Sequence, residues 1–321
     1  MADGPGPLIA GFDAGQTHTT CRLATLLPDG HWQAISEAGG SGVSHLAARG
    51  GTERFEAALR SSLRAALQQA GLDATTSLAG AGIGASGIEV GSPVQQQGID
   101  LASACLTMPR RQVVVLGDER TALAGAFGQE AGILVISGTG CIALGSDGRG
   151  NDHRCGGWGW LLDGAGSAMD IGRDGLALSV QMADGRLAET ALREELWLSL
   201  GASSAQEVKA AVVHPEFGAA GFARLAPVLD QLALRGDSQA QAVIERSAVA
   251  LAAMVQTIAE RLQLPQPAVC GVGGALTHLR SLQEGFDRAL SQRIPGAQQQ
   301  APAGDACAGA LNLAAQAALR C

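Results

Sequence analysis

The sequence predicts an α/β protein built from two similar halves, with a ligand-binding cleft between them. Three observations support this prediction. Short apolar segments of strand length alternate with helical patterns along the chain. A strand, a glycine-rich turn and a second strand occur twice, at 8–27 and at 132–146. The length of 321 residues and the hydrophobic fraction of 46% are sufficient for two moderate cores.

The first half begins with three predicted antiparallel strands. The first two are close enough in sequence to form a hairpin, and Pro28, Asp29 and Gly30 predict a turn before the third. Apolar residues then recur at helical spacing until Gly71, which is expected to end the helix. The predicted order is β-β-β-α-β-α-β, with strands at 8–13, 21–27, 31–38, 78–85 and 112–117 and helices at 52–70 and from Pro93.

The second half is expected to repeat this order with longer helical insertions. Helical patterns dominate from 165 to 264, and the longest of them covers 239–262. The predicted strands cover 132–137, 141–146, 151–156 and 268–272, and a C-terminal helix covers 305–319. We therefore assign 1–117 to an N-terminal domain, joined by 305–321, and 118–304 to a C-terminal domain, with a hinge at 118–128.

The composition favours a small-molecule ligand. The formal net charge is −8 without any long run of Lys or Arg, so neither nucleic acid nor a membrane is an expected partner. No apolar segment approaches the roughly 20 residues of a membrane span, and residues 1–7 lack signal-peptide features. We therefore expect a cytoplasmic protein.

The cysteines are isolated from one another, without zinc-site spacing; they are Cys21, Cys105, Cys141, Cys155, Cys270, Cys307 and Cys321.

The segment GFDAGQTHTT, from Gly11 to Thr20, places a tight turn between the first two strands. Backbone N–H groups and side chains of Gly15, Gln16 and Thr17 can surround phosphate oxygens there. Asp13 can reach a magnesium ion directly or through water. An ordinary glycine-containing hairpin turn would have the same short pattern.

The segment SGTGCIALG, from Ser137, has the same strand, turn and strand context. Two such turns at equivalent places in repeated halves are less expected by chance than one, and they could hold a triphosphate from both sides. Gly138, Thr139 and Gly140 are the candidate phosphate-binding residues of this second turn. Neither segment fits the P-loop pattern G-x-x-x-x-G-K-[ST].

Asp118 follows the apolar segment Val113–Leu116 and opens a predicted helix. A carboxylate is favoured at the N-terminus of a helix and would face the cleft there. We interpret Asp118 as the base that removes a proton from an attacking sugar hydroxyl, while the turns and magnesium stabilise the phosphoryl group. The alternative is a purely structural N-cap.

Two further glycine-rich segments are candidates for ligand binding. The segment RCGGWGWLLDGAGS, from Arg154 to Ser167, carries Gly157, Trp158 and Asp163, which could bind a sugar ring and its hydroxyls. Core tryptophans beneath a loop are the alternative. Gly273 and Gly274 follow a predicted strand and would leave room for an adenine ring against the backbone, although a simple strand-to-helix turn would look similar.

In this order, the motifs resemble those of the BadF/BadG/BcrA/BcrD ATPase family, and within it the N-acetylglucosamine and glucosamine kinases. The resemblance covers nearly the whole chain. Its most specific part is SGTGCIA from Ser137, GGWGWLL from Gly156 and GSAMDIGR from Gly166 to Arg173. These segments are similar to the family patterns S-G-T-G-S-x-A, G-G-W-G-x-L-L and G-S-x-x-x-I-G-R.

The resemblance implies two ribonuclease-H-like domains of the actin-like ATPase type, ATP with Mg²⁺, and transfer to a sugar hydroxyl, expected to be the 6-hydroxyl. It implies Asp118 as the catalytic aspartate, Trp158 in the sugar-binding turn and a homodimeric assembly. Carried over by position, the nucleotide-binding residues are Asp13, Gly15, Thr17, Gly138, Thr139, Gly140, Gly273 and Gly274.

Three departures from the family pattern concern the sugar. The pattern L-L-G-D-E-G-S reads LLDGAGS here, so the acidic residue, Asp163, is shifted by one position. Related kinases often carry G-P-x-N where this chain has GVSH, which places Ser44 or His45 where an asparagine would contact the sugar. Cys141 replaces a common serine, so a thiol, which bonds more weakly, replaces a hydroxyl.

Three alternatives remain open. An ATPase that activates an acyl-CoA dehydratase would hold an iron–sulfur cluster through closely placed cysteines, whereas the cysteines here are scattered. A non-catalytic sugar-binding regulator would need a helix-turn-helix segment, and only about seven residues precede the first strand. A kinase-like protein could also have lost its activity through the changes near Asp163 and His45.

Overall fold

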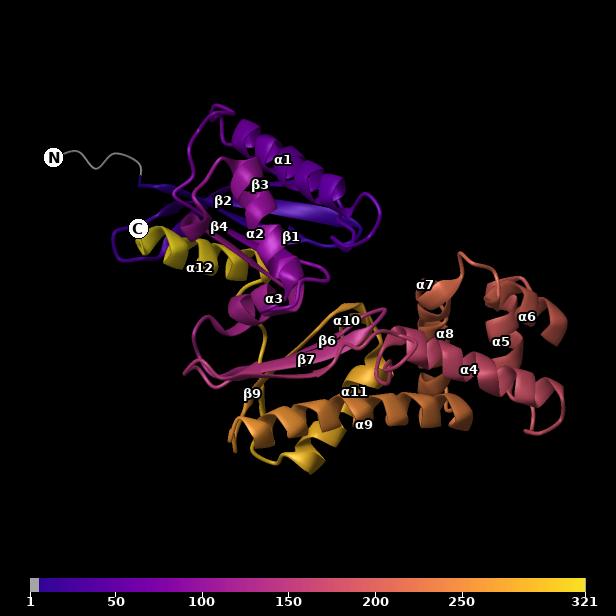
Figure 1. The fold of residues 1–321 in the computed structure, drawn as a ribbon. Helices are drawn as coiled ribbons and strands as arrows, with labels where there is room; N and C mark the ends of the chain where they lie inside the picture. The colour runs from indigo at the N-terminus through magenta and orange to yellow at the C-terminus, as the bar shows by residue number, and fades with distance from the viewer. Residues whose placement is uncertain (1–5, 321) are drawn as a thin grey trace. The chain divides into compact units, whose positions relative to one another are not determined.

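The computed structural model describes residues 6–320 (Figure 1). The predictions made for residues 1–5 and for Cys321 lie outside this range. The chain forms two compact units: unit 1 comprises Met1–Gln129 with Pro302–Cys321, and unit 2 comprises Glu130–Ala301. The domain boundaries predicted from the sequence lie before Asp118 and after Gly304.

The sheet of unit 1 has the order β3-β2-β1-β4-β5. The strands β1, β2 and β3 form the predicted antiparallel meander, while β4 and β5 run parallel to β1. Both β1 and β4 are buried along nearly their whole length, as expected for central strands covered on both faces. The strands are β1 Leu8–Ala14, β2 His18–Leu26, β3 Trp32–Ser41, β4 Gly80–Ala85 and β5 Val113–Leu116.

The helices α1 (Gly51–Gln69) and α2 (Pro93–Leu106) belong to unit 1. Helix α1 buries Phe55, Leu59 and Ala66 at helical spacing and packs against β2 and β3. Helix α2 begins as its sequence predicts, with Ser92 accepting a hydrogen bond from the Gln95 N–H and a proline in the first turn. A short 3₁₀ turn at Arg110–Gln112 leads into β5.

The helices α3 (Asp118–Phe127) and α12 (Ala306–Leu319) pack against each other within unit 1. Their backbones approach so closely that a Cβ atom on Gly309 would overlap the Thr121 carbonyl oxygen. Helix α12 also packs on β1 and β4. This packing fixes the helix whose first residue is Asp118 against the central strands of the sheet.

Unit 2 contains a second sheet with the order β10-β9-β6-β7-β8. Strands β6, β7 and β8 are an antiparallel meander, and β9 and β10 run parallel to β6. The strand order and directions are the same as in unit 1, with β6 in the place of β1. The predicted repeat is therefore confirmed. The strands are β6 Gly132–Ser137, β7 Cys141–Ser146, β8 Asp152–Gly156, β9 Ala268–Val272 and β10 Gln298–Gln299.

Six helices connect β8 to β9, where unit 1 has only α1 between its third and fourth strands. Side-chain oxygens of Ser167, Thr190, Ser204 and Asp237 accept hydrogen bonds at four of the helix N-termini. These helices are α4 Ala168–Ala183, α5 Ala191–Leu200, α6 Ala205–Val212, α7 Gly218–Ala223, α8 Ala226–Leu234 and α9 Ser238–Arg261. After β9 follow α10 Gly274–His278 and α11 Arg280–Arg293.

Helix α9 requires a correction to the sequence analysis. By length and composition alone it is long and apolar enough to cross a membrane, and half of its apolar window is buried inside the protein. It packs against α8, α11 and the sheet of unit 2. This extensive packing is that of a core helix of a folded protein. Such a helix can be as long and apolar as a membrane span.

Candidate functional site

The predicted site residues of unit 1 lie where the parallel strands end. Asp13 lies near the end of β1, Ser86 follows β4, and Asp118 follows β5 after one glycine. Because β1, β4 and β5 are parallel, their carboxyl ends lie at one edge of the sheet. This edge is where open α/β sheets generally bind ligands.

Asp13 and Asp118 interact electrostatically at this edge. Burial raises the pKa of the Asp13 carboxyl above its usual value of 3.8, and the charge of Asp118 raises it further. Burial also raises the pKa of the adjacent Glu119, again with a contribution from Asp118. The edge therefore holds close carboxyl groups whose negative charges are incompletely compensated.

Asp118 is not the N-cap of α3. Gly117 occupies the cap position, and Asp118 is the first residue of the helix. Its Oδ1 atom accepts a hydrogen bond of 3.0 Å from the N–H of the next residue, Glu119. Its side chain remains partly exposed. The alternative of an N-cap is therefore wrong, and the catalytic role of Asp118 stays a prediction.

The turn between β1 and β2 contains Gly15, Gln16 and Thr17. The side chains of Gln16 and Thr17 are exposed, as a ligand-binding turn requires. The Gly15 carbonyl accepts a hydrogen bond of 2.9 Å from the Val43 N–H, which ties the turn to the segment after β3. Gln16 Nε2 donates to Ser86 Oγ over 3.4 Å. The turn is thus connected to the end of β4.

Ser44 and His45 lie in the segment that binds this turn. His45 Nδ1 accepts a hydrogen bond of 3.2 Å from the Ala47 N–H, so in the neutral ring Nε2 carries the proton. The ring packs over Gly87, whose backbone has a φ of +81°. The Ser44 hydroxyl is buried without a hydrogen-bond partner. The structure therefore brings Gln16 and His45 to the Ser86–Gly87 segment.

The second turn, Gly138–Gly140, lies between β6 and β7 in unit 2 and is held by the start of α4. The Gly138 carbonyl accepts from the Ala168 N–H at 2.9 Å, and the Thr139 carbonyl from the Met169 N–H at 3.4 Å. The Thr139 side chain is exposed. The N-terminus of α4 thus fixes the backbone of the turn and leaves Thr139 available to a ligand.

Gly273 and Gly274 lie beside this second turn. Strands β6 and β9 are parallel, so Ser137 and Val272 end at the same edge of the sheet. Gly273 has a φ of +93°, and a Cβ atom there would overlap the Ser137 carbonyl oxygen. The Gly274 nitrogen lies 3.9 Å from where a Cβ atom on Gly138 would be. Two separately predicted nucleotide-binding segments are therefore neighbours.

The loop after β8 exposes its apolar side chains. Trp158 is 64% exposed and Trp160 is 38% exposed, so the alternative of core tryptophans is wrong. The Arg154 guanidinium lies over the Trp158 ring, 4.8 Å from its centroid, and donates to the Gly157 carbonyl at 2.7 Å. The cation–π contact of Arg154 therefore occupies one face of the Trp158 ring and helps to orient it.

Asp163 lies within this loop, and Cys141 directly follows the second turn as the first residue of β7. Burial raises the pKa of the Cys141 thiol to about 12, and the nearby charge of Asp163 contributes. The thiol donates to the Ala165 carbonyl at 3.2 Å. Cys141 therefore stays protonated at neutral pH and holds the loop against β7, while Asp163 remains partly exposed.

The number of carboxyl groups near Asp13 indicates which kind of metal ion could bind there. Among the described residues, no group of three or more His, Cys, Asp and Glu side chains could hold a metal ion. Mg²⁺ usually needs only one or two protein carboxylates, because water and phosphate oxygens complete its coordination. The undercompensated pair of Asp13 and Asp118 fits an ion of this kind, and Asp13 is the candidate ligand.

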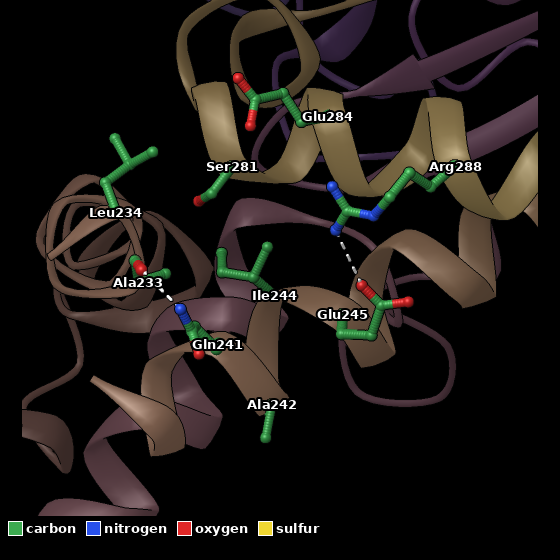
Figure 2. Close-up of a pocket in the computed structure, with 9 residues that line it drawn as sticks. All are labelled: Ala233, Leu234, Gln241, Ala242, Ile244, Glu245, Ser281, Glu284 and Arg288. Atoms are coloured by element: carbon green, nitrogen blue, oxygen red, sulfur yellow. Dashed lines mark hydrogen bonds and ion pairs between the residues drawn. The ribbon is translucent and has the colours of Figure 1, made fainter. Parts of the chain in front are cut away.

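A cavity of about 590 Å³ lies away from all these residues, between α8, α9 and α11 (Figure 2). Its charged groups are largely paired: Arg288 bonds Glu245 at 3.2 Å, and Glu284 bonds Arg280 at 2.8 Å. Gln241 donates to the Ala233 carbonyl at 3.1 Å. None of the predicted site residues lines this cavity, and it adds nothing to the candidate site.

Ser86 and Gly87, which contact Gln16 and His45, were not among the predicted site residues, because they lie just beyond the predicted strand at 78–85. A polar residue and a glycine directly after a buried strand were the available signal, since Asp118 was recognised by the same context. The remaining predicted residues form two groups, one in each unit. That both groups bind one nucleotide stays a prediction.

The comparisons with known proteins place the chain in a family. The model of the BadF/BadG/BcrA/BcrD ATPase family matches residues 10–314. The chain belongs to this family. The resemblance inferred from the motifs is therefore confirmed, and it extends over both units.

Two curated relatives carry kinase names. The N-acetylmuramic acid/N-acetylglucosamine kinase of Clostridium acetobutylicum is 27% identical over 186 residues, which are 57% of this chain and 61% of the relative. The N-acetyl-D-glucosamine kinase of Dictyostelium discoideum is 28% identical over 179 residues, which are 54% of this chain and 56% of the relative. The matched part thus spans less than two thirds of each relative.

The structural likeness extends over nearly the whole chain. The crystal structure of a proposed N-acetylglucosamine kinase from Chromobacterium violaceum has a TM-score of 0.76 and 26% sequence identity. It covers 96% of this chain and 99% of that protein. Together with the two sheets of equal topology, this likeness confirms the predicted pair of ribonuclease-H-like domains of the actin-like ATPase type.

Proposed function

We propose that the protein is an ATP-dependent kinase that phosphorylates the 6-hydroxyl of N-acetylglucosamine or a related amino sugar. The observation that carries this proposal is the close placement of Asp13 and Asp118 at the carboxyl ends of parallel strands. Family membership and the kinase names of the relatives support it. One of these names includes N-acetylmuramic acid, which is a second candidate substrate.

Asp118 is the proposed catalytic base. Its partly exposed carboxylate is held at the first residue of α3, and α3 is fixed by its close packing on α12. A general base must be ionised and aimed at the hydroxyl that it deprotonates. Asp13 is the proposed cation ligand, because a cation bound there would offset the repulsion between its carboxylate and that of Asp118.

The two turns are the proposed phosphate-binding elements. The turn of Gly15, Gln16 and Thr17 in unit 1 exposes the side chains of Gln16 and Thr17, and the turn of Gly138, Thr139 and Gly140 in unit 2 exposes that of Thr139. The Gly138 N–H donates to the Gly140 carbonyl at 2.8 Å, so Gly138 is proposed to shape the second turn. Gly273 and Gly274 are proposed to lie against the adenine ring. When bound at Asp13, Mg²⁺ would neutralise charge on the transferring phosphoryl group.

The proposed sugar contacts are Ser44 and His45 in unit 1 and Gly157, Trp158 and Asp163 in unit 2. The exposed Trp158 ring, oriented by Arg154, provides an apolar face for a pyranose ring. His45 Nε2–H is a donor for a sugar hydroxyl or for the acetyl carbonyl. Asp163 is an acceptor for hydroxyls.

A coupled assay of ADP release with Mg²⁺ and ATP tests the proposal. The panel contains N-acetylglucosamine, glucosamine, N-acetylmuramic acid, glucose and 6-deoxy-N-acetylglucosamine. We expect turnover with N-acetylglucosamine and none with the 6-deoxy analogue, which lacks the attacking hydroxyl. ATP hydrolysis that no sugar stimulates would contradict a kinase and favour an ATPase activator. Turnover of the 6-deoxy analogue would show that another hydroxyl is phosphorylated.

A further inference from the structure

A groove of about 420 Å³ lies in unit 2 between α4, α6 and α7. Helix α4 packs against α5 and α7, and α6 packs against α5 (Figure 1). The groove contains no residue of the candidate active site. Its volume lies within the range of about 300–1,000 Å³ that is usual for small-molecule pockets.

The walls of the groove are two helical stripes of equal length, each with three apolar residues and one cation. Both stripes have the spacing i, i+3, i+4 and i+7, so each presents one continuous helix face. Phe222 of α7 also lines the groove. The stripe on α4 comprises Arg173, Leu176, Ala177 and Val180, and that on α6 comprises Ala205, Val208, Lys209 and Val212.

Both charged residues of the groove are cations, but only one of them forms ion pairs with carboxylates. Arg173 forms ion pairs with Asp170 and Asp174. Lys209 is exposed and has no ion pair within the described part of the chain. No carboxylate is among the nine lining residues. An anionic group beside Lys209 would therefore meet an unpaired ammonium, whereas a cation would be repelled.

The size and chemistry of the groove favour one alkyl chain. An apolar lining is stabilised by apolar surface, at about 25 cal/mol per Å² removed from water. A two-turn helix about 10 Å across would fill roughly 850 Å³, about twice the groove. We propose that the groove binds an anionic single-chain amphiphile, with its alkyl chain between α4 and α6 and its carboxylate beside Lys209.

Calorimetric titration with dodecanoate, below its micelle-forming concentration, tests the proposal. We expect saturable binding of one molecule per chain, weaker binding of dodecanol and the weakest binding of dodecyltrimethylammonium. Ala177→Phe fills the exposed wall of the groove and should weaken dodecanoate binding at least tenfold. Ala210→Phe, on an exposed position of α6 outside the groove, is the matched control and should bind as the wild type does.

Lys209 allows a second, independent measurement, because it is the only lysine in the sequence. Lys209→Gln should weaken dodecanoate binding threefold to fivefold, as expected for an exposed ion pair, and Lys209→Arg should restore it. Bound dodecanoate should slow acetylation of Lys209 by an amine-reactive reagent, measured by mass spectrometry, but not acetylation of the N-terminal amine.

Several outcomes would overturn the proposal. They are the absence of saturable binding, equal binding of the trimethylammonium compound, and unchanged binding in Ala177→Phe. A dimer in light scattering that Ala177→Phe converts to a monomer would show instead that a second copy covers the groove. Circular dichroism of each variant separates these outcomes from misfolding.

Discussion

The carboxyl group of Asp118 lies close enough to that of Asp13 to raise its pKa. The two residues are about a hundred positions apart, Asp13 near the end of β1 and Asp118 just after β5, so the parallel pairing of β1, β4 and β5 brings them to one edge. Their proximity has a thermodynamic consequence as well as a chemical one.

Asp13→Asn should make unfolding in the absence of metal less favourable at pH 7. The folded pKa of Asp13 is above the unfolded value of 3.8, so the folded protein binds this proton more tightly. The free energy of unfolding therefore falls as the pH rises from 3.8 through the folded pKa. Asn does not ionise, so the variant does not lose this stability as the pH rises. The difference in free energy of unfolding between the variant and the wild type should disappear below pH 3.8. Urea unfolding at several pH values, with the exposed Glu53→Gln as control, measures it.

The same substitution should abolish kinase activity, although it stabilises the fold. An amide is a weaker ligand than a carboxylate for Mg²⁺. The combination of higher stability and lost turnover distinguishes a functional carboxylate from a structural one. Lower stability at pH 7 together with full turnover would contradict both parts.

Asp118→Asn should reduce kcat by about 10²–10⁴-fold, the usual contribution of a general base. Calorimetric affinities for ATP and sugar should change little, because the amide keeps the size of the side chain. Glu119→Gln is the matched control in the same helical turn and should stay within a few-fold of the wild type. Unchanged turnover in Asp118→Asn would remove this residue from the mechanism.

Trp158→Ala should raise the KM for the sugar by about tenfold, since a stacked ring is worth roughly 1–1.5 kcal/mol. The KM for ATP should be unaffected. Trp160→Ala, in the same loop and 38% exposed, serves as the control for general loop effects. Equal effects of the two substitutions would mean that the loop, and not the Trp158 ring, determines sugar affinity.

Gly273→Ala should destabilise unit 2 by at least about 2 kcal/mol, because alanine rarely adopts a φ of +93° and its Cβ would overlap the Ser137 carbonyl oxygen. Relief of the overlap would displace the second turn and weaken ATP binding. Gly271→Ala, whose Cβ would lie 3.3 Å from a Leu276 side-chain atom, is the control. Urea unfolding and nucleotide titration measure the two effects.

Asp305 contributes to stability in two ways that matched variants separate. Its side chain caps α12 by accepting from the Ala308 N–H at 2.8 Å, and it binds Arg22 at 2.7 and 2.8 Å. Asp305→Ala should cost about 1–2 kcal/mol, whereas Asp305→Asn keeps the cap and should cost less than about 1 kcal/mol. Arg22 holds the pKa of Asp305 below 3.8, so this stability is present above pH 3.8 and is lost as the pH falls through the folded pKa.

The repeated order of strands could be predicted because each strand is a short apolar segment next to a strong turn signal, as at Gly138–Gly140. Strand β10, Gln298–Gln299, was missed because two polar residues carry no periodicity. Within the helical region at 165–264, only the longest helix, at 239–262, was predicted separately. The caps of this region at Thr190, Ser204 and Asp237 and its left-handed Gly201 were the signals that divide it into helices.

The residue types of the candidate site could also be predicted, but not their surroundings. Exposure of Trp158 depends on where the loop docks, and that is decided by bonds such as the one from Cys141 to Ala165, 24 positions apart. The contact between His45 and Gly87 depends likewise on pairing between β1 and β4. Single-sequence patterns report local periodicity and contain no information on such distant pairs.

Helix α12 affects the order in which the protein can fold during synthesis. Unit 2 is continuous from 130 to 301, so it can fold as soon as it has emerged from the ribosome. Unit 1 must wait for Ala306–Leu319, because this helix covers the apolar faces of β1 and β4. The unit that is translated first is therefore completed last, and until then it exposes a surface on which chaperones or aggregation can act.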